Sequence, residues 1–350
     1  MIQTTEELIQ QLKTDPRTDA GILAAYCRII SLYGDEEDAA ALFRVFAEDP
    51  TDYRRSLLLD PVMRCGGRVL AEEIDSFCFD QGKLRENIPS EILHVLGFMG
   101  YEKYVKYMVD CVCADDWDLS KDACLGLIHL PCQSHRERLA DEWNKAYGQP
   151  LFSEFLPALS FKFSDERIVP DLLAWGQQAS TDCNAGLLLG IAMFGRRQKE
   201  LILRILLDPS WELYSSGTGS HWWAYMSMRL TGLAFAEIIS ELKERTPVGR
   251  SAITVPDERM IEHGYHVLHD LLDLKLAGDL HPIKSAPALK ERMLDLYRHL
   301  FQWSTGHEDD SVSGRIGAYL GYGHPLIEKY SSLRMKMEIA LQKELELSLR

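Results

Sequence analysis

Three histidines recur at three-residue steps in the segment EHGYHVLHDLLD, at His263, His266 and His269. Residues four apart share one face of a helix, so His266 and Asp270 could hold a divalent metal through an imidazole and a carboxylate. Two ligands do not complete a metal site, and the sequence does not identify a third. The alternative is an amphipathic helix whose histidines pack or cap without any cofactor.

The segment SSGTGSHWWAYMSMR, residues 215 to 229, has the most unusual composition in the chain. A glycine-rich turn before a helix can present backbone amides to an anion, although GTGS lacks the spacing of a phosphate-binding loop and a preceding strand. The residues of a candidate pocket or contact patch here are His221, Trp222, Trp223 and Arg229. The simpler interpretation buries the two tryptophans in the next helical layer.

The sequence offers no pattern for nucleophilic catalysis. No G-x-S-x-G motif follows a strand, and the eight cysteines have no recognisable histidine partner. Cys111 and Cys113 form a C-x-C pair without a second pair at zinc-finger spacing. We predict reduced, buried cysteines that pack as small apolar side chains.

Acidic residues dominate the chain, whose net charge is −15. Residues 1–150 carry 16 Lys and Arg against 27 Asp and Glu, a net −11, and residues 151–350 carry −4. This balance argues against nucleic acid, because phosphate binding needs a basic surface, and it favours a basic protein partner. The alternative is that acidity only keeps the protein soluble. Candidate partner-binding acids are Glu37, Asp38, Glu72, Glu73, Glu102 and Asp110.

Composition is that of a folded chain, with 46% hydrophobic and 26% charged residues. No window approaches about 18 uninterrupted apolar residues, and the N-terminus lacks the basic start and apolar core of a signal peptide. We therefore expect a cytoplasmic protein that does not bind membranes.

A recurring pattern organises the first two thirds of the chain: an apolar run, a turn-prone residue, charged residues and an amphipathic run. The turns fall near Gly34, Gly66, Gly100, Cys132, Ser164 and Gly195, at spacings of 32, 34, 32, 32 and 31 residues. Each interval has room for two helices of about 12 residues and two short connections. The pattern predicts an all-α fold, an α-solenoid of about six stacked helical hairpins.

The two helices of each predicted hairpin differ in character. The first, as in SKDACLGLIHL and CNAGLLLGIAMF, is apolar on nearly all sides, whereas the second, as in EEDAAALFRVFAED, has one charged face. A glycine at the turn suits a left-handed C-cap, and the acids after Gly34 suit the positive N-terminal end of the second helix.

Residues 29–49 and 92–110 are similar to short HEAT-type repeats of the variety named after phycobilisome lyases. The resemblance covers roughly residues 20 to 207. It implies an extended binding surface, with the second helices lining a concave acidic trough; the alternative is a solvated exterior. The chain lacks the usual Asp-Pro after most turns. It also lacks the paired His-Glu dipeptides of HEAT-repeat hydroxylases, since His307-Glu308 is the sole such dipeptide.

Three regions are predicted: an N-terminal cap helix at 1–19, the repeat array at 20–210, and an irregular helical region at 211–350. The favoured function is a non-catalytic protein-binding solenoid, and one candidate role is an inhibitor or immunity-type protein that sequesters a basic partner. The alternative is an enzyme, or a cofactor- or metal-handling protein, with a pocket between the array and the C-terminal helices. A DNA-glycosylase-like use of such repeats is disfavoured by the charge.

Overall fold

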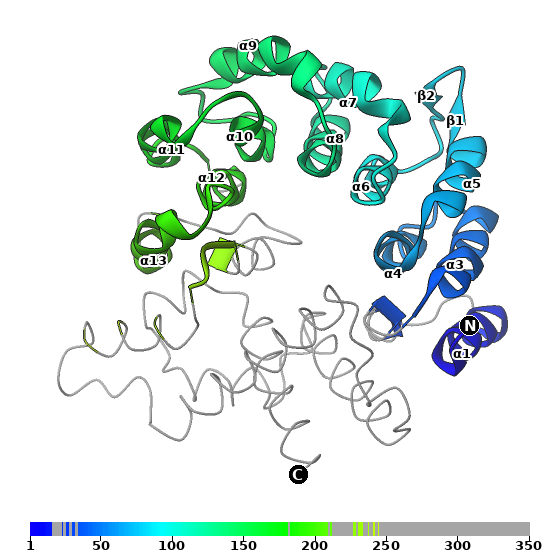
Figure 1. Cartoon of the computed structure of the whole chain (residues 1–350). Coiled ribbons are helices and arrows are strands. Elements are labelled where there is room, and N and C mark those ends of the chain that lie inside the picture. Colours follow the sequence, from blue (N-terminus) through cyan, green and yellow to red (C-terminus); the bar gives the residue numbers. More distant parts are fainter. Residues whose placement is uncertain are drawn as a thin grey trace. The chain divides into compact units, whose positions relative to one another are not determined.

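A computed structural model describes the chain in two long stretches, 34–180 and 183–208, and in the first 15 residues. Isolated described positions lie between these stretches and at 211–244. The described residues are mostly helical (Figure 1). They fall into two compact units, here called unit 1, up to Glu102, and unit 2, from Lys103 onward.

Unit 1 contains helices separated by short turns and one small β-hairpin. Its elements are α1 (Gln3–Thr14), α3 (Glu36–Glu48), η1 (Arg55–Leu58), α4 (Leu59–Cys65), α5 (Arg68–Cys78), β1 (Phe79–Asp80), β2 (Lys83–Leu84) and α6 (Glu91–Phe98). Helix α3 packs against α1, α4 and α5, and α4 packs against α6. The apolar stripe of α3 supplies Leu42, Phe43 and Phe46 to this core, each at most 1% exposed.

The β-hairpin of unit 1 was not predicted from the sequence. Phe79 pairs with Leu84 and Asp80 with Lys83, and the turn residues Gln81 and Gly82 have φ values of 48° and 80°. Two positive φ values in a two-residue loop match the twist of antiparallel strands. The insertion lies between α5 and α6, and the interval from Gly66 to Gly100 is the longest of the predicted spacings, at 34 residues.

Unit 2 continues the alternation of helix types. Its elements are α7 (Val105–Val112), α8 (Trp117–His129), η3 (Gln133–His135), α9 (Arg136–Ala146), η4 (Leu156–Leu159), α10 (Ser160–Phe163), η5 (Glu166–Ile168), α11 (Val169–Gly176), α12 (Asn184–Ala192), η6 (Gly195–Gln198) and α13 (Lys199–Leu207), and η2 (Glu102–Tyr104) opens α7. Helix α7 packs against α8, α9 against α10, and α11 against α12. Each of these close pairs joins one helix to the next α-helix along the chain.

Helix α12 is buried over its whole length of nine residues. Gly186 and Gly190 lie one turn apart on the side that meets η4, where a Cβ on Gly186 would overlap the carbonyl oxygen of Glu154. A Cβ on Gly190 would lie 2.6 Å from the carbonyl oxygen of Pro157. The two glycines therefore let the α12 backbone lie directly against the backbone of the neighbouring segment.

Five of the predicted turn positions, Gly66, Gly100, Cys132, Ser164 and Gly195, lie where one described helical segment gives way to the next. Gly100 and Gly195 have φ values of 72° and 80°, as the predicted left-handed cap requires. The same prediction is wrong for Gly66, whose φ of −74° and ψ of 155° are extended, and for Gly34 and Ser164, neither of which has a positive φ.

Candidate protein-binding surface

The N-terminus of α3 is organised by two aspartates. The Asp35 side chain accepts hydrogen bonds from the backbone N–H groups of Glu37 and Asp38, at 3.0 and 3.2 Å, and the Asp38 side chain accepts one from the backbone N–H of Asp35, at 2.9 Å. This reciprocal capping box satisfies backbone donors that the helix cannot pair internally. Partial burial raises the pKa of Asp35, but the hydrogen bonds from Asp38 and Glu37 outweigh this effect and lower the pKa overall.

Asp38 is buried, with no exposed surface, and its carboxylate also accepts a hydrogen bond of 2.9 Å from the backbone N–H of Ile2. It therefore joins the start of α1 to the start of α3. The sequence placed Asp38 among the partner-binding acids, and the structure corrects this, because a buried carboxylate with backbone partners does not face a binding protein.

Glu37 is exposed at the same helix end and forms an ion pair with the Met1 amino group. This hydrogen bond raises the pKa of the amine. The Glu37 side chain is 74% exposed, so solvent weakens the pair and leaves the carboxylate accessible.

Helices α3 and α5 lie side by side in unit 1 and form one acidic surface, here called the α3–α5 face. It consists of Glu36, Glu37, Val69, Glu72 and Glu73, all exposed. The Glu36 side chain reaches from α3 to the start of α5. Its Oε2 lies 3.1 Å from the position that a Cβ would take at Gly67. The α5 N-terminus has no side-chain cap of its own, so a carboxylate at this end is favoured by the helix dipole.

Two arginines lie beside the acids of this face. Arg44 is 3.8 Å from Glu73, and Arg68 is 3.6 Å from Glu72. Both arginine side chains are largely exposed, at 70% and 87%. Long, solvated pairs of this kind contribute about 0–1 kcal/mol, so the acids can exchange these partners for others.

Val69 lies among the acids of the α3–α5 face and is 76% exposed. It precedes Glu72 and Glu73 by three and four residues, which places it on the same side of α5. An exposed apolar residue beside charged side chains is typical of a protein contact, where an apolar centre excludes water and a charged rim orients the partner. Val69 was not among the site residues predicted from the sequence. The sequence feature that could have identified it is an apolar residue outside the buried stripe of Leu70, Ala71 and Ile74.

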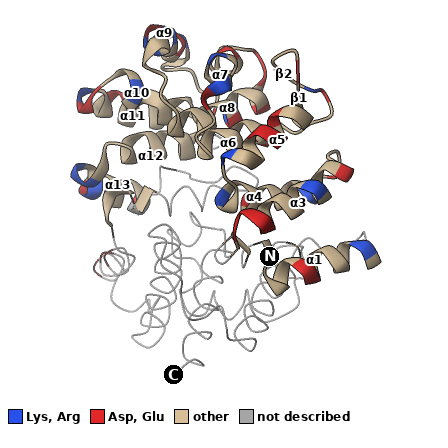
Figure 2. Ribbon diagram, turned by 45° about the vertical axis from the view of Figure 1, so that its right-hand side comes forward, with Lys and Arg blue, Asp and Glu red and all other residues tan. Residues whose placement is uncertain are grey.

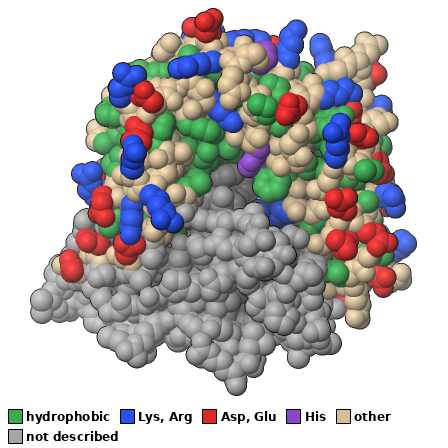
Figure 3. All heavy atoms as spheres, viewed as in Figure 1, with side chains coloured by type: hydrophobic (Ala, Val, Ile, Leu, Met, Phe, Trp, Pro, Cys, Tyr) green, Lys and Arg blue, Asp and Glu red, His purple; other side chains and the backbone are tan. Residues whose placement is uncertain are grey.

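The charge of the α3–α5 face contrasts with that of the corresponding helices in unit 2. Helices α3 and α5 together carry seven Asp and Glu and two Lys and Arg, whereas α7 and α9 carry four of each. The ribbon colours make the difference visible (Figure 2). In the space-filling view, Asp and Glu side chains lie exposed over the helices of unit 1, with Lys and Arg side chains among them (Figure 3).

The other two predicted partner-binding acids are Glu102 and Asp110. Glu102 is exposed at the first residue of η2. Asp110, on α7 in unit 2, forms an ion pair with Arg138 of α9, so its charge is compensated locally. Of the six predicted acids, Glu37 is exposed on α3, where it pairs with Met1, and Glu72 and Glu73 are exposed on α5.

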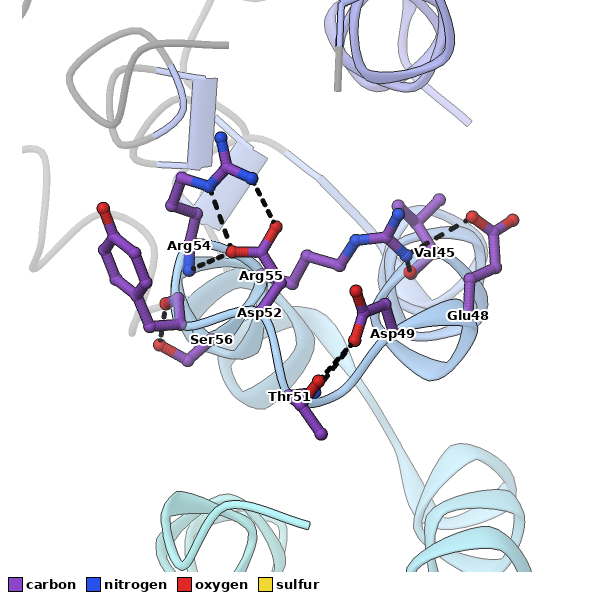
Figure 4. A network of polar contacts seen from close by, with 9 residues as sticks. Val45, Glu48, Asp49, Thr51, Asp52, Arg54, Arg55 and Ser56 are labelled. Atoms are coloured by element: carbon purple, nitrogen blue, oxygen red, sulfur yellow. Dashed lines mark hydrogen bonds and ion pairs between the residues drawn. The ribbon is translucent and has the colours of Figure 1, made fainter. Parts of the chain in front are cut away.

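A polar network braces the loop between α3 and η1 (Figure 4). Arg54 binds both carboxylate oxygens of Asp52, at 3.0 and 2.7 Å, and Arg55 donates to the carbonyl oxygen of Val45 and to Glu48. The hydrogen bond from Arg54 lowers the pKa of Asp52. The braced loop exposes Tyr53 to 77%, a second apolar surface residue of unit 1.

The cysteines have no partner sulfur and match their predicted state. None of the eight forms a disulfide, and seven are buried while Cys113 is intermediate. Burial raises the pKa of the Cys78 thiol and of the Cys124 thiol to about 12 in each case, which makes both poor nucleophiles. Among the described residues, no three His, Cys, Asp or Glu side chains gather as a metal-binding group.

Two sets of predicted site residues lie outside the described part of the chain. These are the candidate pocket of His221, Trp222, Trp223 and Arg229 and the candidate metal ligands His266 and Asp270.

Comparison with known protein families, with curated proteins and with solved structures found no match to this chain. None of the described helices combines the length and the apolar character needed to cross a bilayer. The arguments for function therefore rest on the surfaces themselves.

Proposed function

We propose that this protein is a non-catalytic binding protein whose helical hairpins stack as a HEAT-like α-solenoid of about six repeats and whose α3–α5 face holds a basic protein partner. The observations that carry the proposal are the four exposed glutamates of α3 and α5 and the exposed Val69 on the same side of α5 as Glu72 and Glu73. Sequestering a basic protein, as an inhibitor or immunity-type protein does, is the role that this surface suits best.

Electrostatics supports a basic partner. Residues 34–102 carry 15 Asp and Glu and seven Lys and Arg, a net charge of −8, whereas residues 103–208 carry 15 and 12, a net charge of −3. Complementary charge accelerates encounter and fixes orientation, and Val69 adds an apolar contact that charge alone does not provide.

The test uses affinity capture from native-host lysate with the full chain. Glu72→Lys/Glu73→Lys is expected to abolish recovery of a basic protein that the unchanged chain retains. Glu137→Lys/Asp141→Lys on α9 is the matched control, because it replaces two exposed acids of unit 2 and changes the net charge equally.

Two results of this experiment would contradict the proposal. Equal recovery with both variants would contradict the role of the α3–α5 face. Equal loss with both variants would show that total charge, rather than this face, governs capture. Helical circular dichroism of each variant checks that the fold is retained.

A further inference from the structure

Unit 2 exposes two large apolar side chains close to the hydrogen bond that joins two of its segments. Trp117, the first residue of α8, is 41% exposed, and Leu151, in the loop before η4, is 59% exposed. The Ser120 hydroxyl lies 2.6 Å from the Ser153 hydroxyl. Trp117 is three residues before Ser120 and Leu151 is two residues before Ser153, so this hydrogen bond ties together the two segments that carry the exposed side chains.

Three hydrogen bonds to backbone carbonyl groups fix the loop that presents Leu151. Its carbonyl groups at Gln149, Pro150 and Phe152 accept hydrogen bonds from the Trp175 indole N–H at 2.8 Å, the Ser180 backbone N–H at 2.8 Å and the Cys183 thiol at 3.3 Å, respectively.

Aromatic packing adds to these bonds. The Tyr147 ring stacks on Trp143, with centroids 4.8 Å apart, and the Phe152 ring lies 4.0 Å from Trp175. A loop fixed before binding loses little conformational entropy on contact, so its exposed apolar side chain is suited to act as an anchor site.

Three aspartates surround Trp117 in the sequence DDWD. Asp115, Asp116 and Asp118 are all exposed, and Asp116 also caps α8 by accepting a hydrogen bond of 3.0 Å from the backbone N–H of Leu119. The nearby base is Lys121, whose Nζ is 3.5 Å from Asp118. An indole face beside carboxylates attracts Lys and Arg side chains through cation–π and ionic contacts together.

We propose that Trp117 and Leu151, with Asp115, Asp116 and Asp118, form a second docking surface that takes a basic peptide segment carrying an apolar anchor next to Lys or Arg. The aspartates supply the charge complementarity, and the two apolar side chains supply the desolvated contact. This inference rests on the proposed function, because it assigns the second surface to the same basic partner, but the surface belongs to unit 2 alone.

A random peptide library, with members about 12 residues long, tests the surface when displayed on phage and selected on the full chain. We expect enriched peptides to combine Lys or Arg with Trp, Phe or Leu. Their synthetic forms should bind Trp117→Ser/Leu151→Ser at least about tenfold more weakly than the unchanged chain in fluorescence anisotropy. Leu151→Asp, at the more exposed of the two positions, keeps the test valid if the double variant fails to fold.

Matched variants separate this inference from the proposed function. Tyr53→Ser removes an exposed aromatic of unit 1 and should leave peptide affinity unchanged, whereas Glu72→Lys/Glu73→Lys reports on the α3–α5 face. Weaker peptide binding by the Trp117 and Leu151 variants supports the second docking surface, whether or not Glu72→Lys/Glu73→Lys also weakens peptide binding. Absence of enriched peptides, enrichment without positive charge, or loss only with the α3–α5 variant would overturn it.

Discussion

Helices α3 and α5 of unit 1 and helices α7 and α9 of unit 2 each come after one of the predicted turns, yet they differ in what they offer to solvent. The first pair carries seven acids and two bases, and the second pair carries four of each. The internal contacts also differ, because glycines bring backbones together in unit 2 while an acidic capping box joins α1 to α3 in unit 1. A shared helical pattern can therefore support an exposed acidic surface in one place and close backbone packing in another.

The largest expected effect concerns the tight packing of unit 2. Gly186→Ala would force a Cβ into the carbonyl oxygen of Glu154, and we expect it to lower the free energy of unfolding by about 3 kcal/mol or more. Gly67→Ala in unit 1 is the matched change, because its Cβ would meet the flexible end of Glu36. Chemical denaturation should show a loss of about 1 kcal/mol or less there, and equal losses at the two sites would remove the contrast in packing.

A smaller difference is expected between two aspartates at helix starts. Asp38 is buried and accepts hydrogen bonds of 2.9 Å from both Asp35 and Ile2, whereas Asp116 is exposed and accepts one from Leu119. Asp38→Ala should cost about 2 kcal/mol of stability and Asp116→Ala about 1 kcal/mol or less, by thermal or urea unfolding. A larger loss at Asp116 would show that burial is not what distinguishes these caps.

The smallest expected effect is a pH dependence shared by the units. Asp52 and Asp165 each bind the Arg two residues later, and the hydrogen bond from Arg167 lowers the pKa of Asp165 to about 2. A carboxylate with a depressed folded pKa contributes stability above its unfolded pKa, near 3.8 here, and loses that contribution as pH falls toward 2.

Carboxyl carbon NMR should therefore find Asp165 still ionised at about pH 3. Asp165→Asn should reduce the loss of stability between about pH 4 and pH 2. Titration of Asp165 at an ordinary pKa would show that the Arg167 contact is not maintained in solution.

Local signals explain what could be predicted from the sequence. Gly100 and Gly195 mark turns because a positive φ is a backbone requirement, and the acids after Gly34 follow from the needs of a helix N-terminus. The Gln81-Gly82 hairpin was missed because its two-residue strands are too short to show an alternating pattern.

Surface roles depended on packing that the sequence does not display. Asp38 and Glu37 are adjacent acids, but only their positions relative to α1 decide that one is buried and the other exposed. Val69 likewise differs from Leu70 only in which side of α5 meets the neighbouring helices. The acidic composition suggested a partner, whereas the location of its candidate site required the structure.

The association rate of the captured basic partner tests the central claim most directly. At about 50 mM salt the unchanged chain and Glu137→Lys/Asp141→Lys should associate at similar rates, and both should slow markedly at about 300 mM. Glu72→Lys/Glu73→Lys should associate at least about tenfold more slowly at low salt and show a weaker salt dependence. An unchanged rate in that variant, or an equal decrease in both variants, would contradict a binding site on the α3–α5 face.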